Sequence, residues 1–464
     1  MKKNISRRDF LAQSGSLALM SSSVLSTFGV FQKALAAANT SGGYKALVCL
    51  HMAGGNNGHN FIVPIDSAGY ATYAAGRTNL ALAQSSLLPL GTSGYGIHPN
   101  CPELQALYNS NNLAVVANVG NLIAPVTLAQ AKSGTVPLPP QLFAHNDQAN
   151  QFLSGQANSI SGLGWSGKLA DLLVTQGLKP NLAFAINASG VANPWQVGAT
   201  TTPYFYGSNG APSIAPIAYS GSFYGARATA FNSLVSSAAN SNNPLIRQHS
   251  AIVTSSVTKS TTVNQALQTA GDLTTVFPSP VRPDGTAGDW GLGAQLHEVA
   301  RIIKAQSVIG DVRQMFFVEI GGFDTHGAEL ATQAGLLTYV SQYISTFQKA
   351  MVELNMQNNV TLFTTSDFGR TLTSNNGGAD HGWGNHHIVV GGAVKGGQIY
   401  GTFPDLTLGG PNDFGYGRLL PTTSSDQVAA KLAQWFGVTS ATDLANIFPN
   451  VGNFDSSKLT IMGA

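Results

Sequence analysis

Apolar runs of strand length alternate with segments of helical periodicity along the first part of this chain. Residues 44–52 (YKALVCLHM) and 113–119 (LAVVANV) are apolar runs of the length of a buried strand. Between them, Leu104, Leu107 and Tyr108 fall on one face of a helix. This strand–helix–strand order predicts parallel strands that are covered by helices.

The same order returns in the second half of the chain. Residues 315–318 (MFFV) and 360–365 (VTLFTT) predict two further strands, and residues 182–186 (LAFAI) are a third candidate. A long helix is predicted between the first two, because apolar residues recur there at spacings of three and four: Leu337, Val340, Ile344, Phe347, Met351 and Leu354.

Two more helices complete the pattern. One carries Leu296, Val299 and Ile303, and another follows the capping sequence at residues 423–427 (TSSDQ) and ends near Gly437. We therefore predict one three-layer α/β/α sandwich with a mainly parallel sheet, over residues 37–464.

A change in composition marks an insertion in this domain. From about residue 187 to residue 264 charged residues almost vanish, and Ser, Ala, Asn, Thr and Gly dominate, with scattered aromatic residues. We interpret this segment as a polar insertion that lies over one end of the sheet, and not as an independent domain.

The charge pattern excludes one class of function. Charged residues make up 9% of the 464 residues, against roughly 25% in ordinary soluble domains. The net charge is +2, and no run of Lys or Arg follows the first eight residues. Nucleic-acid binding needs a concentrated basic face, so we expect no nucleic-acid partner.

The N-terminus has the pattern of a twin-arginine export signal. Residues 6–11 (SRRDFL) precede a mostly apolar stretch and a small-residue cleavage site at residues 34–36 (ALA). We expect residues 1–36 to be removed after passage through the twin-arginine export machinery, which places the protein in the periplasm or outside the cell. No later stretch reaches the roughly 18 apolar residues that a bilayer span needs, so we expect no stable span in the mature protein.

The two cysteines leave two alternatives open. Cys49 and Cys101 do not form a Cys-x-x-Cys pair, which argues against a thiolate metal site. Outside the cytosol they could form a disulfide, or they could be two small buried side chains.

Polar clusters follow the predicted strands at residues 54–60, 321–326 and 366–371. In sheets of this kind ligands gather beyond the carboxyl ends of the strands. Imidazole and carboxylate groups bind zinc and manganese. We therefore predict a divalent-metal site with these candidate ligands: Asp324, His326, Asp367, Asp380, His381 and His387. For residues 324–326 alone, a capped helix start with a solvated histidine is the alternative.

Two further residues are candidates for chemistry. Arg370 could hold an anionic group with two parallel hydrogen bonds, or it could pair with Asp367 or Asp380. His145 could be a general acid or base, or a histidine that orients a loop. His51 lies inside the first strand and is interpreted as structural.

Several motifs together resemble one bacterial family. They are residues 54–58 (GGNNG), 143–145 (FAH), 322–326 (GFDTH), 366–371 (SDFGRT), 380–382 (DHG) and 391–397 (GGAVKGG). The chain resembles the family called domain of unknown function 1501, which is itself similar to the alkaline phosphatase and sulfatase superfamily. The resemblance implies an alkaline phosphatase-like sandwich with one or two divalent cations (zinc, manganese or calcium) that clamp a phosphate or sulfate ester.

The chain departs from that family at two positions. Asn57, a candidate substrate-binding residue, stands where the family usually has aspartate, and Ala144 stands where it usually has serine. An alanine cannot be a nucleophile, so any attack is expected from a water molecule activated by the cation. Two hypotheses follow: an exported metal-dependent hydrolase of phosphate or sulfate esters, or a non-catalytic exported protein that binds a glycan or a partner through the insertion.

Overall fold

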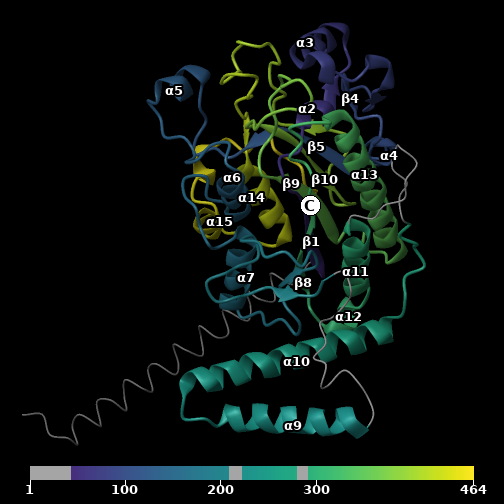
Figure 1. The fold of residues 1–464 in the computed structure, drawn as a ribbon, viewed down its shortest axis with the longest axis vertical. Coiled ribbons are helices and arrows are strands. Elements are labelled where there is room, and N and C mark those ends of the chain that lie inside the picture. Colours follow the sequence, from purple (N-terminus) through teal and green to yellow (C-terminus); the bar gives the residue numbers. More distant parts are fainter. Residues whose placement is uncertain (1–42, 208–221, 279–290, 464) are drawn as a thin grey trace, which may run out of the picture.

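A mostly parallel sheet lies between two layers of helices (Figure 1). The computed structural model describes residues 43–207, 222–278 and 291–463. The predicted export signal, residues 1–36, lies outside the described residues. Within the described part, no helix combines the length and the apolar character needed to cross a membrane.

The described strands form one nine-stranded sheet and one small three-stranded sheet. The order in the large sheet is β11 (Ile399–Tyr400), β5 (Leu113–Gly120), β10 (Asn385–Val390), β9 (Val360–Ser366), β1 (Lys45–Met52), β8 (Arg313–Ile320), β6 (Ala185–Asn187) and β7 (Tyr204–Phe205), with β12 (Thr423–Ser424) also paired to β5. β10 is antiparallel to both of its neighbours, and the other pairs are parallel. The predicted fold class is confirmed.

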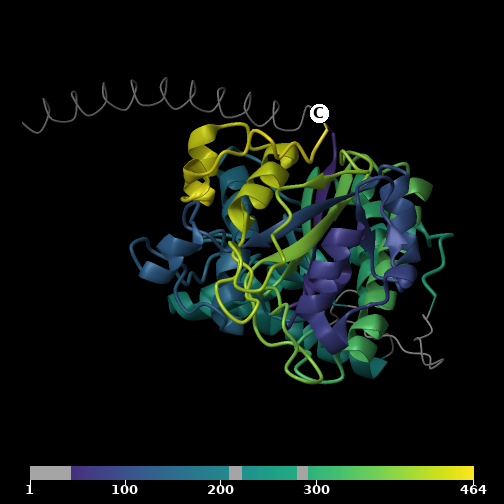
Figure 2. The same ribbon diagram turned by 90° about the horizontal axis from the view of Figure 1, so that it is seen from above.

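Central strand β1 shows why the sheet needs a layer of helices on each face. Alternate side chains of a strand point to opposite faces; Val48 and Leu50 enter one apolar core and Leu47 the other. The helices of the first core are α4 (Pro102–Asn109), α11 (Leu292–Lys304) and α13 (Glu329–Glu353). Those of the second are α6 (His145–Ser154), α7 (Trp165–Thr175), α14 (Ser425–Phe436) and α15 (Ala441–Ile447). Seen from above, α14 and α15 (yellow) and α13 (green) lie on opposite sides of the sheet (Figure 2).

The predicted strands and helices are present, and one strand is shorter than predicted. β6 begins at Ala185 rather than at residue 182. The backbone N–H groups of Asn181, Leu182 and Ala183 all donate to the Asp311 carboxylate. They are therefore not available to a neighbouring strand. The α14 helix begins at the predicted cap, where Ser424 and Gln427 form a capping box, and its C-cap is Gly437.

Short elements fill the carboxyl end of the sheet and its margins. The small sheet consists of β2 (Ile62–Pro64), β4 (Tyr95–Ile97) and β3 (Leu88–Pro89). The remaining short elements are α2 (Gly58–Phe61), α3 (Ser67–Arg77), η1 (Thr78–Leu80), η2 (Gln84–Ser86), α5 (Leu128–Ser133), α12 (Gln306–Ile309) and η3 (Val451–Asn453).

Much of the polar insertion is a pair of helices, α9 (Ser222–Ala239) and α10 (Pro244–Ala270), along the lower edge of Figure 1. The far end of α10 packs on the body through Val263, Ala266 and Leu267. α10 also contacts α12, which comes just before the start of β8. The pair therefore lies at the amino end of the strands, away from the loops at the carboxyl end.

The two cysteines are free and buried. Cys49 belongs to one apolar core and Cys101 to the other, so the sheet separates them. Of the two alternatives, the pair of small buried side chains is correct.

Candidate metal centre

Two glycines let the loop after β1 contact the loops after β8 and β9. Gly54 and Gly55 have φ values of +111° and +84°, which residues other than glycine rarely adopt. A Cβ on Gly54 would lie 2.5 Å from the backbone nitrogen of Asp324, and one on Gly55 would lie 2.6 Å from the Phe368 ring. The three polar clusters predicted at strand ends are therefore in contact.

A folded-back loop brings His381 to the same place. Arg370 and His381 form an isolated antiparallel bridge. Thr371 donates its backbone N–H to the carbonyl of Asp380 at 2.9 Å, and Gly382 donates to that of Gly369 at 2.7 Å. His145 reaches the site from a separate layer, as the first residue of α6.

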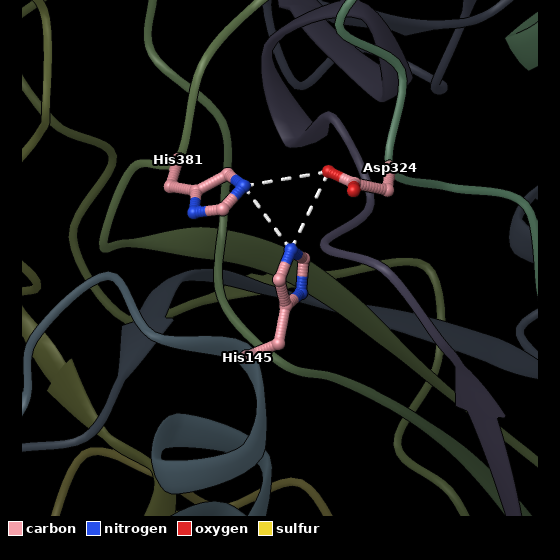
Figure 3. Close-up of side chains that lie close together, drawn as sticks. All are labelled: His145, Asp324 and His381. Atoms are coloured by element: carbon pink, nitrogen blue, oxygen red, sulfur yellow. Dashed lines mark hydrogen bonds and ion pairs between the residues drawn. The ribbon is translucent and has the colours of Figure 1, made fainter.

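His145, Asp324 and His381 point three ligand atoms at one another (Figure 3). The Nε2 atoms of the two histidines are 3.1 Å apart, and each lies 3.4 Å from Asp324 Oδ1. In a tetrahedral zinc site with ligands at roughly 2.1 Å, neighbouring ligand atoms are about 3.4 Å apart. The three atoms therefore have close to the spacing of one face of such a site.

His326 adds a third imidazole beside this triangle. Its Nε2 atom is 2.9 Å from His381 Nε2 and 3.0 Å from Asp324 Oδ1. A proton on one ring can satisfy one of the two short nitrogen–nitrogen contacts. A divalent cation can accept the lone pairs of several rings at once.

The other ring nitrogen of each histidine faces an oxygen acceptor. His145 Nδ1 is 2.7 Å from Asp367 Oδ2, His326 Nδ1 is 3.0 Å from Asp380 Oδ1, and His381 Nδ1 is 2.7 Å from the carbonyl oxygen of Phe143. These contacts place the ring proton on Nδ1 and leave the lone pair on Nε2. Metal-binding histidines use the same arrangement to fix their tautomer.

The electrostatics keep Asp324 ionised. Burial alone raises the pKa of this half-exposed carboxyl, but the hydrogen bond and positive charge of Arg370 outweigh burial and hold the pKa below its usual value. The hydrogen bond to Asp367 raises the pKa of His145, whereas burial lowers that of His381. Asp324 therefore supplies a full negative charge to any bound cation.

The prediction that Arg370 grips an anion is wrong. Its side chain is fully buried, and its N–H groups already have partners. They donate to the carbonyl oxygens of Gly54, Gly55, Phe323 and Ala379, and one also meets the Asp324 carboxylate. Arg370 therefore binds the loops together and orients Asp324.

Two predicted ligands orient histidines instead of binding at the centre. Asp367 is buried and accepts from the backbone N–H of Gly54, and it faces His145 and His51. Hydrogen bonds from these histidines outweigh burial and lower its pKa. Asp380 is more exposed and faces His326 and Asn375, and the hydrogen bond from Asn375 lowers its pKa.

His387 is also not a ligand of this centre, contrary to the prediction. It lies on β10 in the core, where its Nδ1 atom is 3.3 Å from Thr364 Oγ1 and its ring packs against Phe152. Burial lowers its pKa to about 3, so the ring stays neutral.

Asn57 does not line the centre, so its predicted role in substrate binding is wrong. It is buried, accepts from the backbone N–H of His59 and donates its amide to Glu329 Oε1. The same oxygen accepts from Arg77 Nη2 at 2.7 Å. An aspartate at position 57 could not donate to Glu329, which explains the amide in this chain.

Two histidines have places in the structure that their local sequence does not show. For His145 the sequence predicts a general acid or base or a histidine that orients a loop, and its place in the ligand triangle depends on packing between α6 and the loops. His51 places Nε2 3.2 Å from Asp367 Oδ1 and Nδ1 3.0 Å from Thr365 Oγ1, so it supports the residue that orients His145. Its signal in the sequence is a polar residue next to the end of an otherwise apolar strand.

One protein family matches part of the chain. Residues 224–447 match the model of the family described as "Protein of unknown function (DUF1501)". The resemblance to that family is confirmed. The matched region contains Asp324, His326 and His381, and His145 lies outside it. A search of curated proteins by sequence finds no match.

Three solved structures illustrate what the fold is similar to. Ps i-CgsB, in complex with k-i-k-neocarrahexaose, has a TM-score of 0.36 and 9% identity over 89% of this chain and 77% of that chain. The PsFucS1 sulfatase from Pseudoalteromonas sp. has a TM-score of 0.34 and 10% identity over 81% of this chain and 69% of that chain. A variant of the alkaline phosphatase PafA has a TM-score of 0.27 and 11% identity over 71% of this chain and 63% of that chain. At such TM-scores the similarities carry no argument about substrate or mechanism.

Proposed function

We propose that this chain is an exported, metal-dependent hydrolase of phosphate or sulfate esters. The observation that carries the proposal is the convergence of His145 Nε2, His381 Nε2 and Asp324 Oδ1, at 3.1 to 3.4 Å from one another. The ester class comes from the resemblance described above. The two imidazoles and one carboxylate are a donor set typical of zinc and accepted by manganese, whereas calcium prefers oxygen ligands only.

The residues of the chain have distinct roles in this proposal. A bound divalent cation would supply a Lewis acid that polarises the ester and lowers the pKa of water. His145, His381 and Asp324 hold the cation, and Asp367 and the Phe143 carbonyl orient the two rings. Arg370 keeps Asp324 charged and in place. Ala144 offers no hydroxyl, so it cannot attack the ester covalently.

Ala144 also favours a second candidate function, a non-catalytic exported binding or assembly protein. Ala144 is the N-cap of α6 and makes no side-chain cap hydrogen bond. In this second candidate the cation stabilises the loops, and the α9–α10 pair binds a glycan or a partner. That pair lies at the end of the sheet opposite the candidate metal centre, so the two roles would be independent.

Elemental analysis of protein purified without chelator tests the proposal. We expect about one zinc or manganese ion per chain, and loss of that ion in Asp324→Ala. Asp405→Ala, in an exposed loop, is the matched control and should retain it. A stable wild-type protein without metal contradicts the proposal.

Hydrolysis assays separate the two candidates. p-Nitrophenyl phosphate and p-nitrophenyl sulfate serve as general substrates, before and after chelation and after return of zinc. Hydrolysis that disappears and returns with the metal supports the hydrolase. A tightly held ion without hydrolysis of either ester supports the binding protein.

A further inference from the structure

We propose that a cavity beside His145 binds the alcohol part of the substrate, and that this part presents hydrogen-bond donors and carries no negative charge. The inference rests on the proposed function and adds a class of leaving group to it. It excludes anionic leaving groups and includes hydroxyl-rich and amine-bearing ones.

The cavity shares the side chain of His145 with the candidate metal centre. It has a volume of about 280 Å³, and its wall includes His145, Asp367 and His51. This volume is near the lower end of small-molecule sites, roughly 300 Å³, so it suits one ring-sized group. His145 belongs to both the cavity wall and the ligand triangle, so in this proposal the alcohol of an ester held at the centre enters the cavity past His145.

Glu319 supplies the charge that selects the ligand. β8 and β1 pair His51 with Glu319, and β1 and β9 pair His51 with Thr365. Residues that are paired in this way project from the same face of a sheet. Glu319, His51 and Thr365 therefore form a polar row under the cavity, in strands that are otherwise mostly apolar.

The Glu319 carboxylate lacks a donor of its own. Within the described residues, its backbone bonds to Gln295, but no hydrogen bond or ion pair reaches its side-chain oxygens. Burial raises the pKa of this carboxyl and the nearby His51 opposes the rise. A partly buried carboxylate without a donor is destabilised, and a ligand that donates a hydrogen bond would offset that cost.

The rest of the wall provides no cation to hold an anion. No lysine or arginine occurs among the described residues that line the cavity. The nearby Arg370 is saturated by backbone carbonyls and Asp324, and it is not part of the wall. Asn146 is exposed at the cavity and makes no side-chain hydrogen bond within the described chain, so it can meet a hydroxyl group. A carboxylate or phosphate deep in the cavity would face the Glu319 and Asp367 carboxylates, and the wall holds no lysine or arginine to offset that repulsion.

Ligand-observed NMR of the metal-loaded protein tests the inference without catalysis. The probes share one ring and differ in charge: methyl glucoside, glucosamine and glucuronate. We expect saturation transfer to methyl glucoside, to glucosamine or to both, with affinity at least about tenfold above that for glucuronate, because one hydrogen bond to a charged group accounts for that factor. A stronger signal for glucosamine identifies an amine ligand, and a stronger signal for the glucoside identifies a hydroxyl ligand.

Variants then assign the effect to the cavity. Glu319→Gln preserves the shape of the side chain and should weaken the binding of the preferred probe about tenfold. It should also reduce the discrimination against glucuronate. Asn146→Ala, at an exposed position that should tolerate the change, should weaken the binding of methyl glucoside. Asn109→Ala, which changes a separate surface groove, should leave all three probes unaffected.

The outcomes separate failure of this inference from failure of the proposed function. Binding of glucuronate as tight as that of the other probes overturns the inference, and so does the absence of binding by both methyl glucoside and glucosamine. Unchanged binding in Glu319→Gln also overturns it. Metal content is measured in the same samples, so a metal-free protein that still binds the glucoside contradicts only the proposed function.

Discussion

Two polar clusters lie at the carboxyl end of the same sheet, and they differ in solvent exposure and in how their charged groups are paired. Arg77, Glu329 and Asn57 form a network that is closed to solvent, in which both charged side chains are 0% exposed. His145, Asp324 and His381 form an open one, in which the Asp324 side chain is 48% exposed. In the first cluster opposite charges meet each other. In the second, Arg370 meets the Asp324 carboxylate from one side, and the Nε2 atoms of the histidines face the same carboxylate oxygen and one another.

The difference shows how to separate a structural cluster from a candidate site. Both clusters contain an arginine, and each arginine donates to backbone carbonyls of neighbouring loops and to one carboxylate. The arginine therefore does not mark the site. What marks it is a group of ligand atoms whose spacing a cation would satisfy.

Breaking the closed network should have the largest effect on stability. Arg77→Met leaves Glu329 buried without its ion partner, and this should lower the free energy of unfolding by about 3–5 kcal/mol. Chemical denaturation measures the change, and elemental analysis should find the same metal content in the folded fraction. Arg301→Met is the matched control, because the Arg301 side chain is 25% exposed and Glu298 keeps its hydrogen bond from Tyr206, and it should cost about 1 kcal/mol or less. Loss of metal at unchanged stability would show that the two clusters are not separate.

Breaking the open cluster should have the next largest effect, on metal affinity. His381→Ala removes a ligand, and the loss should exceed the roughly 100-fold that an outer partner can cost. Competition with a chromogenic chelator measures the affinity. The apo-protein should be about as stable as wild-type apo-protein, because the removed ring is partly exposed. Wild-type metal affinity in this variant would remove His381 from the centre.

Restoring the residue usual in the family should damage the closed network. Asn57→Asp places a carboxylate against Glu329 in a buried site, and we expect a loss of about 2 kcal/mol in the free energy of unfolding. The double variant Asn57→Asp/Glu329→Gln should recover part of the loss, because the amide can then donate. A gain of a second metal ion in Asn57→Asp would contradict the structural role given to Asn57.

The two orienting carboxylates should have the smallest effects, and these should differ. Asp367→Asn should weaken metal binding by at least about tenfold, because a charged partner holds His145 in its tautomer. Asp380→Asn should weaken it less, because the side chain of Asp380 is 52% exposed and that of Asp367 is 7% exposed. The same chelator competition compares both variants. Equal effects would show that burial does not set the strength of this orientation.

Part of this architecture could be predicted from local patterns. Continuous apolar runs indicated β1, β5, β8 and β9, and spacings of three and four indicated α13, because burial on two faces or one face imposes those patterns directly. The polar clusters after the strands were also predicted to meet. Asp324, His326 and His381, which are predicted as ligands, lie close together in the structure.

Other roles could not be predicted, because they depend on partners distant in the sequence. Asp367 and Asp380 have the residue type of a ligand, and only the positions of His145 and His326 make them orienting groups. Arg370 has the residue type of an anion binder, and only the surrounding carbonyls exhaust its donors. β6 was predicted too long because the Asp311 carboxylate takes its N–H groups.

The sequence by itself determined the order of strands and helices and the residue types at the strand ends, since each follows from short-range burial patterns. Tertiary structure alone decided which of those residues face one point. Imidazole and carboxylate groups bind a cation only at short distances and in a particular tautomer. Contacts among α6, the glycine loop after β1 and the loop that ends at His381 determine these distances and tautomers. No local sequence pattern predicts such contacts.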